Sequence, residues 1–143
     1  YNYPCNKFVA GFIGSPQMNF LNAKVEKNGD NYALAFGEYQ IPVQKPELEA
    51  YVGKEVTLGI RPEDIHAEES FLNISEASNI EANVDLAEMM GSEIYLYLTC
   101  AGQNLVARVP SRTGIKAEDH VKLALDTNKI HVFDAETEEI ICH

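Results

Sequence analysis

The sequence has no tryptophan and few basic residues: 11 lysines and arginines stand against 22 aspartates and glutamates, giving a formal net charge of −11. A surface this acidic repels polyanions, so nucleic acid and anionic lipid headgroups are poor partners for the surface as a whole. No apolar run approaches the roughly 20 residues that span a bilayer. No signal peptide is visible, because the chain opens on Tyr1-Asn2-Tyr3-Pro4 instead of a basic segment followed by an apolar one.

Cysteine and histidine are too few and too scattered to predict a disulfide framework or a metal site. The three cysteines are odd in number and contain no Cys-x-x-Cys pair, which favours reduced thiols and a cytosolic setting. No two histidines have the spacing of a His-x-x-x-His ligand pair. The residues in question are Cys5, Cys100 and Cys142, and His66, His120, His131 and His143.

Catalytic motifs are also missing from the sequence. It contains no Gly-x-x-x-x-Gly-Lys-Ser/Thr phosphate loop and no Gly-x-Ser-x-Gly nucleophile turn. The acidic pairs Glu63-Asp64 and Glu68-Glu69 have the residue types of a general acid and base. Adjacent carboxylates on a polar loop are far more typical of solvated surface, so we predict no catalytic residue, cofactor site or metal site in this chain.

What the sequence does contain is a series of short alternating segments separated by turn residues. The clearest has Ile94, Leu96 and Leu98 on one face, and Ala101–Asn104 turns it back into a partner segment. Many short strands at close intervals predict a mainly β protein, built as a closed or nearly closed antiparallel barrel. The expected strands are 20–27, 32–36, 39–43, 55–61, 80–90, 94–100, 105–109, 121–125, 130–133 and 140–141.

Four local expectations can be tested against a structure. The first three strands should form a meander with Pro42 on an edge strand, because proline weakens a central strand. Residues 46–51 should form one or two helical turns, since Pro46 suits a helix start. A strand is expected around Phe71. In the strand 80–90, Ala82, Val84 and Leu86 should share one face.

The first sixteen residues read as a short helix followed by a stop. Phe8 and Phe12 are four apart, as are Val9 and Ile13, which places both pairs along one stripe. Gly14 can end the helix and Pro16 cannot continue it. The plain interpretation is an ordinary amphipathic N-terminal helix, but its apolar stripe requires a partner surface.

A second motif, Gly59-Ile60-Arg61-Pro62-Glu63-Asp64, lies where a strand ends. Pro62 fixes the exit of the chain, and either following carboxylate can pair with the Arg61 guanidinium. That guanidinium presents a fork of donors that could hold a carboxylate or tie down a neighbouring loop. The chemistry of these residues alone favours a structural corner over a binding site.

These two motifs closely resemble the C-terminal regulatory region of ATP-binding subunits from bacterial carbohydrate ABC importers, the maltose/glycerol-3-phosphate/multiple-sugar class. The resemblance is sharpest at Phe8–Leu21 and Gly59–Glu63, and it extends from Pro4 to about Phe133. It implies a barrel of the TOBE/MOP type that is similar to an oligonucleotide-binding (OB) fold, with a small additional strand subdomain. Residues 1–16 would be the tail of a linker helix from an absent nucleotide-binding domain, and 17–143 the regulatory domain.

The resemblance also implies roles for particular residues. The interdomain junction would comprise Gly14, Ser15, Pro16, Met18 and Asn19, and the barrel corner would comprise Gly59, Arg61, Pro62 and Glu63. ATP and magnesium would bind in the absent domain, so this chain alone would be no enzyme.

The same resemblance implies a location and a set of partners. The parent would be cytoplasmic, on the inner face of the membrane. The partners would be a second copy of the subunit, the transmembrane permeases reached through the absent domain and, in some members, a carbon-catabolite regulator.

The sequence also leaves an alternative function open. Small barrels of this kind bind oxyanions such as molybdate, or oligonucleotides that stack on exposed aromatic rings. Tyr95 and Tyr97 lie on one face of a predicted strand and could provide such rings. No cluster of lysine or arginine surrounds them in the sequence, however, and the transported solute cannot be read from this region.

Overall fold

The computed structural model describes residues 17–74 and 76–142, and the expected N-terminal helix lies outside them. The described part is mainly β, as the alternation predicts. Its strands are β1 (Asn19–Asn28), β2 (Asn31–Phe36), β3 (Tyr39–Val43), β4 (Glu55–Ile60), β5 (Ile65–His66), β6 (Asn79–Met90), β7 (Glu93–Cys100), β8 (Gln103–Pro110), β9 (His120–Leu125), β10 (His131–Asp134) and β11 (Ile140–Cys142). Short helical elements connect them: η1 (Pro46–Tyr51), η2 (Pro62–Asp64), α2 (Glu69–Leu72), η3 (Glu76–Ser78), η4 (Ser111–Thr113) and η5 (Thr127–Lys129).

One sheet has six strands in the order β11-β10-β4-β1-β2-β3, and every pairing in it is antiparallel. The predicted meander is confirmed, because β1 pairs with β2 and β2 with β3. Pro42 lies in β3, at the edge of the sheet, where its missing N–H costs no ladder bond on the open side. The turns predicted over residues 46–51 are also present, as η1.

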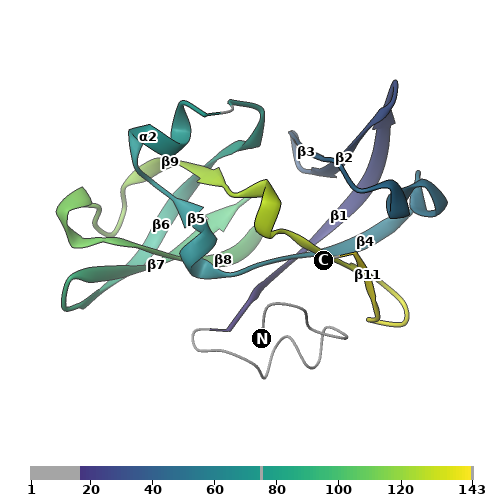
Figure 1. The fold of residues 1–143 in the computed structure, drawn as a ribbon. Coiled ribbons are helices and arrows are strands. Elements are labelled where there is room, and N and C mark those ends of the chain that lie inside the picture. Colours follow the sequence, from purple (N-terminus) through teal and green to yellow (C-terminus); the bar gives the residue numbers. More distant parts are fainter. Residues whose placement is uncertain (1–16, 75, 143) are drawn as a thin grey trace.

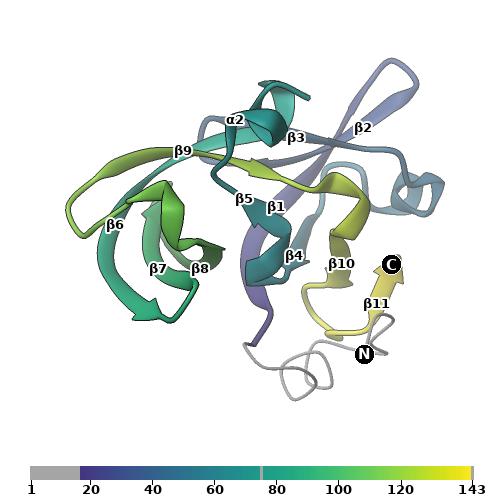
Figure 2. The same cartoon turned by 60° about the vertical axis from the view of Figure 1, so that its left-hand side comes forward.

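The other sheet has five strands in the order β5-β9-β6-β7-β8. Its two end strands, β5 and β8, contact each other, so the sheet curls into a nearly closed barrel. Figures 1 and 2 show the two sheets side by side, with the five-stranded one on the left of Figure 1. The expected OB-like barrel with further strands is therefore confirmed.

The chain passes between the sheets twice, and the two crossovers lie together. It leaves the six-stranded sheet through η2 after β4 and returns through η5 before β10. The N–H of Asp126 donates to the carbonyl of Asp64 at 3.0 Å, and Ile65 pairs with Leu125. The predicted corner motif is thus the first of two adjacent crossovers.

A shared core fills the space between the sheets. Leu21, Leu34 and Leu58 of the six-stranded sheet belong to the same buried cluster as Ile80 and Leu96 of the five-stranded one. Burial of such side chains stabilises each by about 1.5–3 kcal/mol relative to exposure. The two sheets therefore form one hydrophobic unit.

Two local predictions are wrong. Phe71 lies in helix α2 and not in a strand, and its ring stacks on His66 at a centroid distance of 3.8 Å. In β6 a bulge separates Val84 from Leu86. Ala82 and Val84 are buried as predicted, but the extra residue turns Leu86 outward, where it is 52% exposed.

Candidate functional site

Met18 and Gly59, from the two predicted motifs, meet on one face of the six-stranded sheet. Phe20 pairs directly with Gly59, and the Phe20 ring packs edge-to-face on Phe133 at 5.8 Å. A Cβ on Gly59 would lie 2.7 Å from Met18 Sδ and 2.8 Å from Phe133 Cε2, closer than a Cβ atom approaches a non-bonded heavy atom. The glycine is therefore needed so that Met18 and Phe133 can lie over strand β4.

Asn19 fastens the start of β1 to strand β8 of the other sheet. Its Nδ2 donates to the carbonyl of Val106 at 2.7 Å, and its Oδ1 accepts from the N–H of Val106, also at 2.7 Å. The side chain is buried at 7% exposure. β8 is the last strand in the order of the five-stranded sheet. The Asn19 amide therefore satisfies backbone groups at an otherwise open strand edge.

Gln103 makes the reciprocal bridge from β8 to β1. Its Oε1 accepts from the N–H of Asn22 at 2.8 Å, and its Nε2 donates to the Asn22 carbonyl at 3.0 Å. Each of these two amide side chains thus hydrogen-bonds both the N–H and the carbonyl of one residue on the opposite strand. We call Asn19, Asn22, Gln103 and Val106 the β1–β8 clasp.

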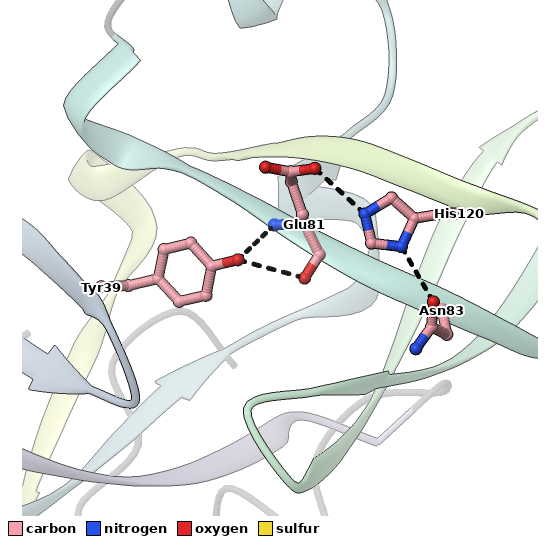
Figure 3. A network of polar contacts seen from close by, with 4 residues as sticks. All are labelled: Tyr39, Glu81, Asn83 and His120. Carbon is pink, nitrogen blue, oxygen red and sulfur yellow. Dashed lines mark hydrogen bonds and ion pairs between the residues drawn. The ribbon is translucent and has the colours of Figure 1, made fainter.

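Tyr39 forms a third bridge between the sheets, shown in Figure 3. Its hydroxyl accepts from the N–H of Glu81 at 3.1 Å and lies 3.4 Å from the Glu81 carbonyl. Glu81 precedes Asn83, where the pairing of β6 with β7 begins, so these backbone groups face an open edge. Burial raises the pKa of the Tyr39 hydroxyl above its ordinary value.

The Glu81 carboxylate continues this network toward β9. His120 lies 3.0 Å from it through Nε2 and 2.8 Å from Asn83 Oδ1 through Nδ1 (Figure 3). These residues line an open cleft of about 410 Å³ that also includes Thr99 and Cys100. Burial raises the pKa of the Cys100 thiol to about 11, so this cysteine is a poor nucleophile at neutral pH.

The corner motif places charged groups at the two crossovers. Arg61 is buried at 4% exposure, and Pro62 begins η2 directly after it. Burial, followed by the nearby charges of Glu63 and Asp126, raises the pKa of the Asp64 carboxyl to about 6. The corner therefore holds the ionised Asp64 carboxylate at an energetic cost, which fits a structural junction between the sheets.

The face that carries Tyr95 and Tyr97 is not basic. Tyr97 hydrogen-bonds the Glu88 carboxylate, and Arg108 forms an ion pair with Glu93 at 3.3 Å. Stacking of oligonucleotides requires aromatic rings within a positively charged groove. The arginine that pairs with Tyr95 across β7 and β8 is already bound to a carboxylate, which argues against oligonucleotide binding here.

The structure brings part of the predicted site together. Asn19 pairs with Ile60 across β1 and β4, and Met18 lies over Gly59. Arg61, Pro62 and Glu63 lie at the crossover. Gly14, Ser15 and Pro16 lie outside the described residues. The cross-sheet bonds of Tyr39 and Gln103 were missed, because they join a side chain to a backbone group 42 and 81 residues away.

Neither a metal site nor a membrane-spanning helix is found in the described part of the chain. Within residues 17–74 and 76–142, no three histidine, cysteine or acidic side chains gather where they could hold an ion. None of the helices of those same residues is long and apolar enough to cross a bilayer. What the arrangement provides is a set of bridges between two sheets and an anchor for the start of β1.

Comparison with known proteins identifies the class. Residues 58–133 match the TOBE domain family, and residues 14–65 match the MalK OB fold domain family. This chain belongs to the TOBE domain family. The resemblance predicted from the junction and corner motifs is thereby confirmed.

The relatives are import proteins that bind ATP. The chain is 43% identical over 142 residues to the oligosaccharides import ATP-binding protein MsmX of Bacillus subtilis, covering 96% of this chain and 38% of that protein. It is 37% identical over 147 residues to the trehalose/maltose import ATP-binding protein MalK of Thermococcus litoralis, covering 99% and 39%. The chain thus spans about two fifths of the length of these curated relatives.

A solved structure shares the fold at low sequence identity. The cytoplasmic molybdate-binding protein ModG matches with a TM-score of 0.59 and 14% identity, over 80% of this chain and 94% of that one. At this identity the likeness extends to the fold alone.

Proposed function

We propose that this chain is the C-terminal regulatory region of an ATP-binding subunit in a carbohydrate ABC importer. The proposal rests on how much of this chain, and how much of each relative, the match covers. Relatives named as sugar import ATP-binding proteins match nearly all of this chain, but only about two fifths of their own length. The remaining length is sufficient for a nucleotide-binding domain, which would bind ATP and magnesium.

In this role, residues 1–16 are the tail of a linker from the nucleotide-binding domain, and 17–143 form the regulatory domain. Gly14, Ser15, Pro16, Met18 and Asn19 make the junction. Support for this assignment comes from the residues directly after the linker. Met18 packs over Gly59, and Asn19 bonds Val106 of the other sheet, so the entering chain is fixed to the whole domain and not to one strand.

The proposed mechanism is tethering. Contact between the regulatory domains of two subunits raises the effective concentration of the attached ATP-binding domains for one another. The ATP-binding domains would then open and close while remaining paired on the cytoplasmic face of the membrane. The permeases would be reached through those domains, and a carbon-catabolite regulator would act on this region in members that have one.

The first test is the gene sequence immediately upstream of Tyr1. We expect it to encode a P-loop domain in the same reading frame. We also expect the purified 143-residue chain to lack ATP hydrolysis. Robust hydrolysis that is abolished by mutating one of the chain's own residues would contradict the proposal.

The second test addresses tethering directly. In the complete subunit, removal of residues 17–143 should make ATP hydrolysis depend more steeply on protein concentration, because the nucleotide domains must then find each other by diffusion. Hydrolysis assays across a range of about a hundredfold in subunit concentration would measure this. Identical concentration dependence with and without the region would exclude a tethering role.

A further inference from the structure

The open cleft of about 410 Å³ beside the network of Figure 3 lies where the two sheets meet. It is lined by the turn between β2 and β3, at Gly37 and Glu38, and by the turn between β7 and β8, at Ala101 and Gly102. The two turns touch, because a Cβ on Gly37 would lie only 2.5 Å from Ala101 Cβ. We call the space beside these turns the seam cleft, and its shape depends on both sheets.

The backbone of Ala101 is strained in this position. Its φ of 51° lies in the left-handed region, which glycine and asparagine adopt more readily than alanine. Gly102, the next residue, also has a positive φ, of 77°. Such strain persists only where the surrounding structure over-determines it, and it gathers at ligand-binding positions. The contact with Gly37 supplies that constraint here.

The polar side chains of the seam cleft are held in place by one another. The Tyr39 hydroxyl is fixed on the backbone of Glu81. His120 lies 3.0 Å from the Glu81 carboxylate and 2.8 Å from Asn83 Oδ1 (Figure 3). These residues come from β3, β6 and β9. A ligand that binds to side chains already in place loses less conformational entropy in ordering them.

These side chains offer both acceptors and donors to a ligand. Glu81 accepts through its carboxylate, and the Asn83 NH₂ group can donate, because Asn83 Oδ1 is the atom that faces His120. The Thr99 hydroxyl donates to the Asp85 carboxylate, which leaves its own lone pairs to accept. A ligand hydroxyl also donates and accepts, so a molecule with several hydroxyl groups matches this mixed set.

The charge of the seam cleft excludes anionic ligands. Among the described residues that line it, Glu38 and Glu81 are acidic and none is lysine or arginine. The Glu38 charge reaches Cys100 within the cleft, where it adds to burial in raising the pKa of that thiol. Two carboxylates with no lysine or arginine beside them repel phosphate and molybdate, so phosphorylated ligands and oxyanions do not fit.

Cations fit the seam cleft no better. When the His120 ring is protonated both of its nitrogens donate, and its pair with Glu81 then carries no net charge. An organic cation would therefore lie beside a positive imidazolium. No three histidine, cysteine or acidic side chains of residues 17–74 and 76–142 gather to hold a metal ion. The ligand that suits this chemistry is neutral and rich in hydroxyl groups.

We propose that the seam cleft binds a neutral mono- or disaccharide, with Glu81, Asn83 and Thr99 hydrogen-bonding its hydroxyl groups. A volume of about 410 Å³ falls within the range of small-ligand sites, about 300–1,000 Å³. The source of the ligand rests on the proposed importer function, because the saccharide would be the imported solute, sensed by this region after uptake. The cleft is open to solvent, so we expect weak binding, with a Kd of about 1 mM.

The test titrates the 143-residue chain with maltose, and separately with trehalose, and follows the backbone amide signals by NMR. At least one of the two sugars should saturate shifts at Asn83, Thr99 and Gly102 with a Kd of about 1 mM. Glucose 6-phosphate should bind at least about tenfold more weakly, because its phosphate meets the carboxylates. Spermidine, an organic cation, should also bind more weakly than the sugar.

A matched pair of variants separates the cleft from the rest of the surface. Asn83→Ala should weaken sugar binding by about tenfold, because it removes a hydrogen-bonding group. Asn128→Ala makes the same change at an exposed position outside the seam cleft, so it should leave binding unchanged. If Asn83→Ala loses its circular-dichroism spectrum, Thr99→Val replaces it and should weaken binding to a similar extent.

The outcomes distinguish this inference from the proposed function. Neither sugar shifting the signals of the cleft at up to about 50 mM would overturn the site. Tighter binding of spermidine or glucose 6-phosphate would overturn the ligand class. A folded Asn83→Ala or Thr99→Val variant that binds as tightly as Asn128→Ala would overturn the residue assignment. All three results leave the importer assignment intact, whereas sugar binding by a chain whose gene encodes no P-loop domain upstream would support the site and overturn the importer assignment.

Discussion

In the middle of strand β4, Gly59 leaves room for two larger side chains that lie over the sheet. A substitution to alanine would place a Cβ 2.7 Å from Met18 Sδ and 2.8 Å from the Phe133 ring. Met18 is flexible, but Phe133 is fully buried and has little freedom to move. We expect Gly59→Ala to destabilise the fold by about 1–3 kcal/mol, a typical cost of overpacking, measured by urea unfolding.

A double-mutant cycle separates crowding from other effects. In a Phe133→Leu background the same Gly59→Ala change should cost clearly less, because the smaller side chain removes part of the clash. Equal costs in the two backgrounds would show that contact with Phe133 is not the reason for the glycine.

The Asp64 carboxyl gives the crossover a dependence on pH. Its folded-state pKa is about 6 against an ordinary value of 3.8, so the folded protein binds an extra proton between about pH 4 and 6. The free energy of unfolding should therefore fall as pH rises through that window. Asp64→Asn should remove this loss and stabilise the fold at about pH 7.5, by about 1 kcal/mol after allowance for partial solvent screening.

Thermal unfolding at about pH 4 and about pH 7.5 checks the sign of this effect. The gain from Asp64→Asn should be present at the higher pH and much smaller at the lower one, where the folded-state carboxyl is protonated and the unfolded-state carboxyl is partly protonated. Glu69→Gln, an exposed change on helix α2, should alter stability little at either pH. A destabilising Asp64→Asn at the higher pH would mean that the ionised carboxylate is needed at the corner.

At the scale of elements, the β1–β8 clasp is where the two sheets are fastened. Asn19→Ala removes two hydrogen bonds and leaves the Val106 N–H and carbonyl without those partners, so we expect a loss of about 2 kcal/mol. Gln103→Ala, at a more exposed position, should cost about 1 kcal/mol or less. Chemical denaturation together with hydrogen exchange at Val106 would measure both effects.

A matched control lies on the same strand. Asn22 contributes only its backbone to the clasp, so Asn22→Ala should keep the bridge and change the free energy of unfolding by less than about 0.5 kcal/mol. An Asn19→Ala variant as stable as Asn22→Ala would show that the clasp adds nothing to the fold.

The elements are more predictable than their connections. Alternation and turn residues locate the strands, and Pro42 correctly predicts an edge, because these signals are local to the chain. The bulge at Asp85 cannot be predicted, since Val84 and Leu86 are both apolar and the alternation looks unbroken. Phe71 is wrongly predicted in a strand because no local signal reports that His66 offers its ring a stacking partner.

The candidate site is predictable only where a motif has unusual residue types. Gly59 stands out in the sequence, but its cause, the close approach of Met18 and Phe133, depends on three segments of the chain. Asn19 falls in the expected interdomain junction, and its bond to Val106 across 87 residues cannot be foreseen. Sequence patterns report which face of a strand is buried, and they do not report which distant backbone group a polar side chain will meet.

At the scale of the whole molecule, the net charge of −11 should govern self-association. Two copies repel each other over a distance set by the Debye length, about 30 Å at about 0.01 M salt and about 8 Å at about 0.15 M. We therefore expect dimerisation to strengthen as salt rises over this range, measured by sedimentation equilibrium. A dimer that weakens with salt would instead be held mainly by ion pairs between the copies.

The position of β1 has a mechanical consequence for the proposed junction. The strand lies inside the six-stranded sheet, between β2 and β4, and is antiparallel to both. A pull transmitted at residue 17 along the strand would load in shear its hydrogen bonds to β4, which begin at Asn19, and to β2, which begin at Lys24, instead of unzipping them one by one. Through its bonds to Val106, Asn19 would transmit part of that force to the five-stranded sheet. The two sheets would therefore move together when the chain upstream of residue 17 moves.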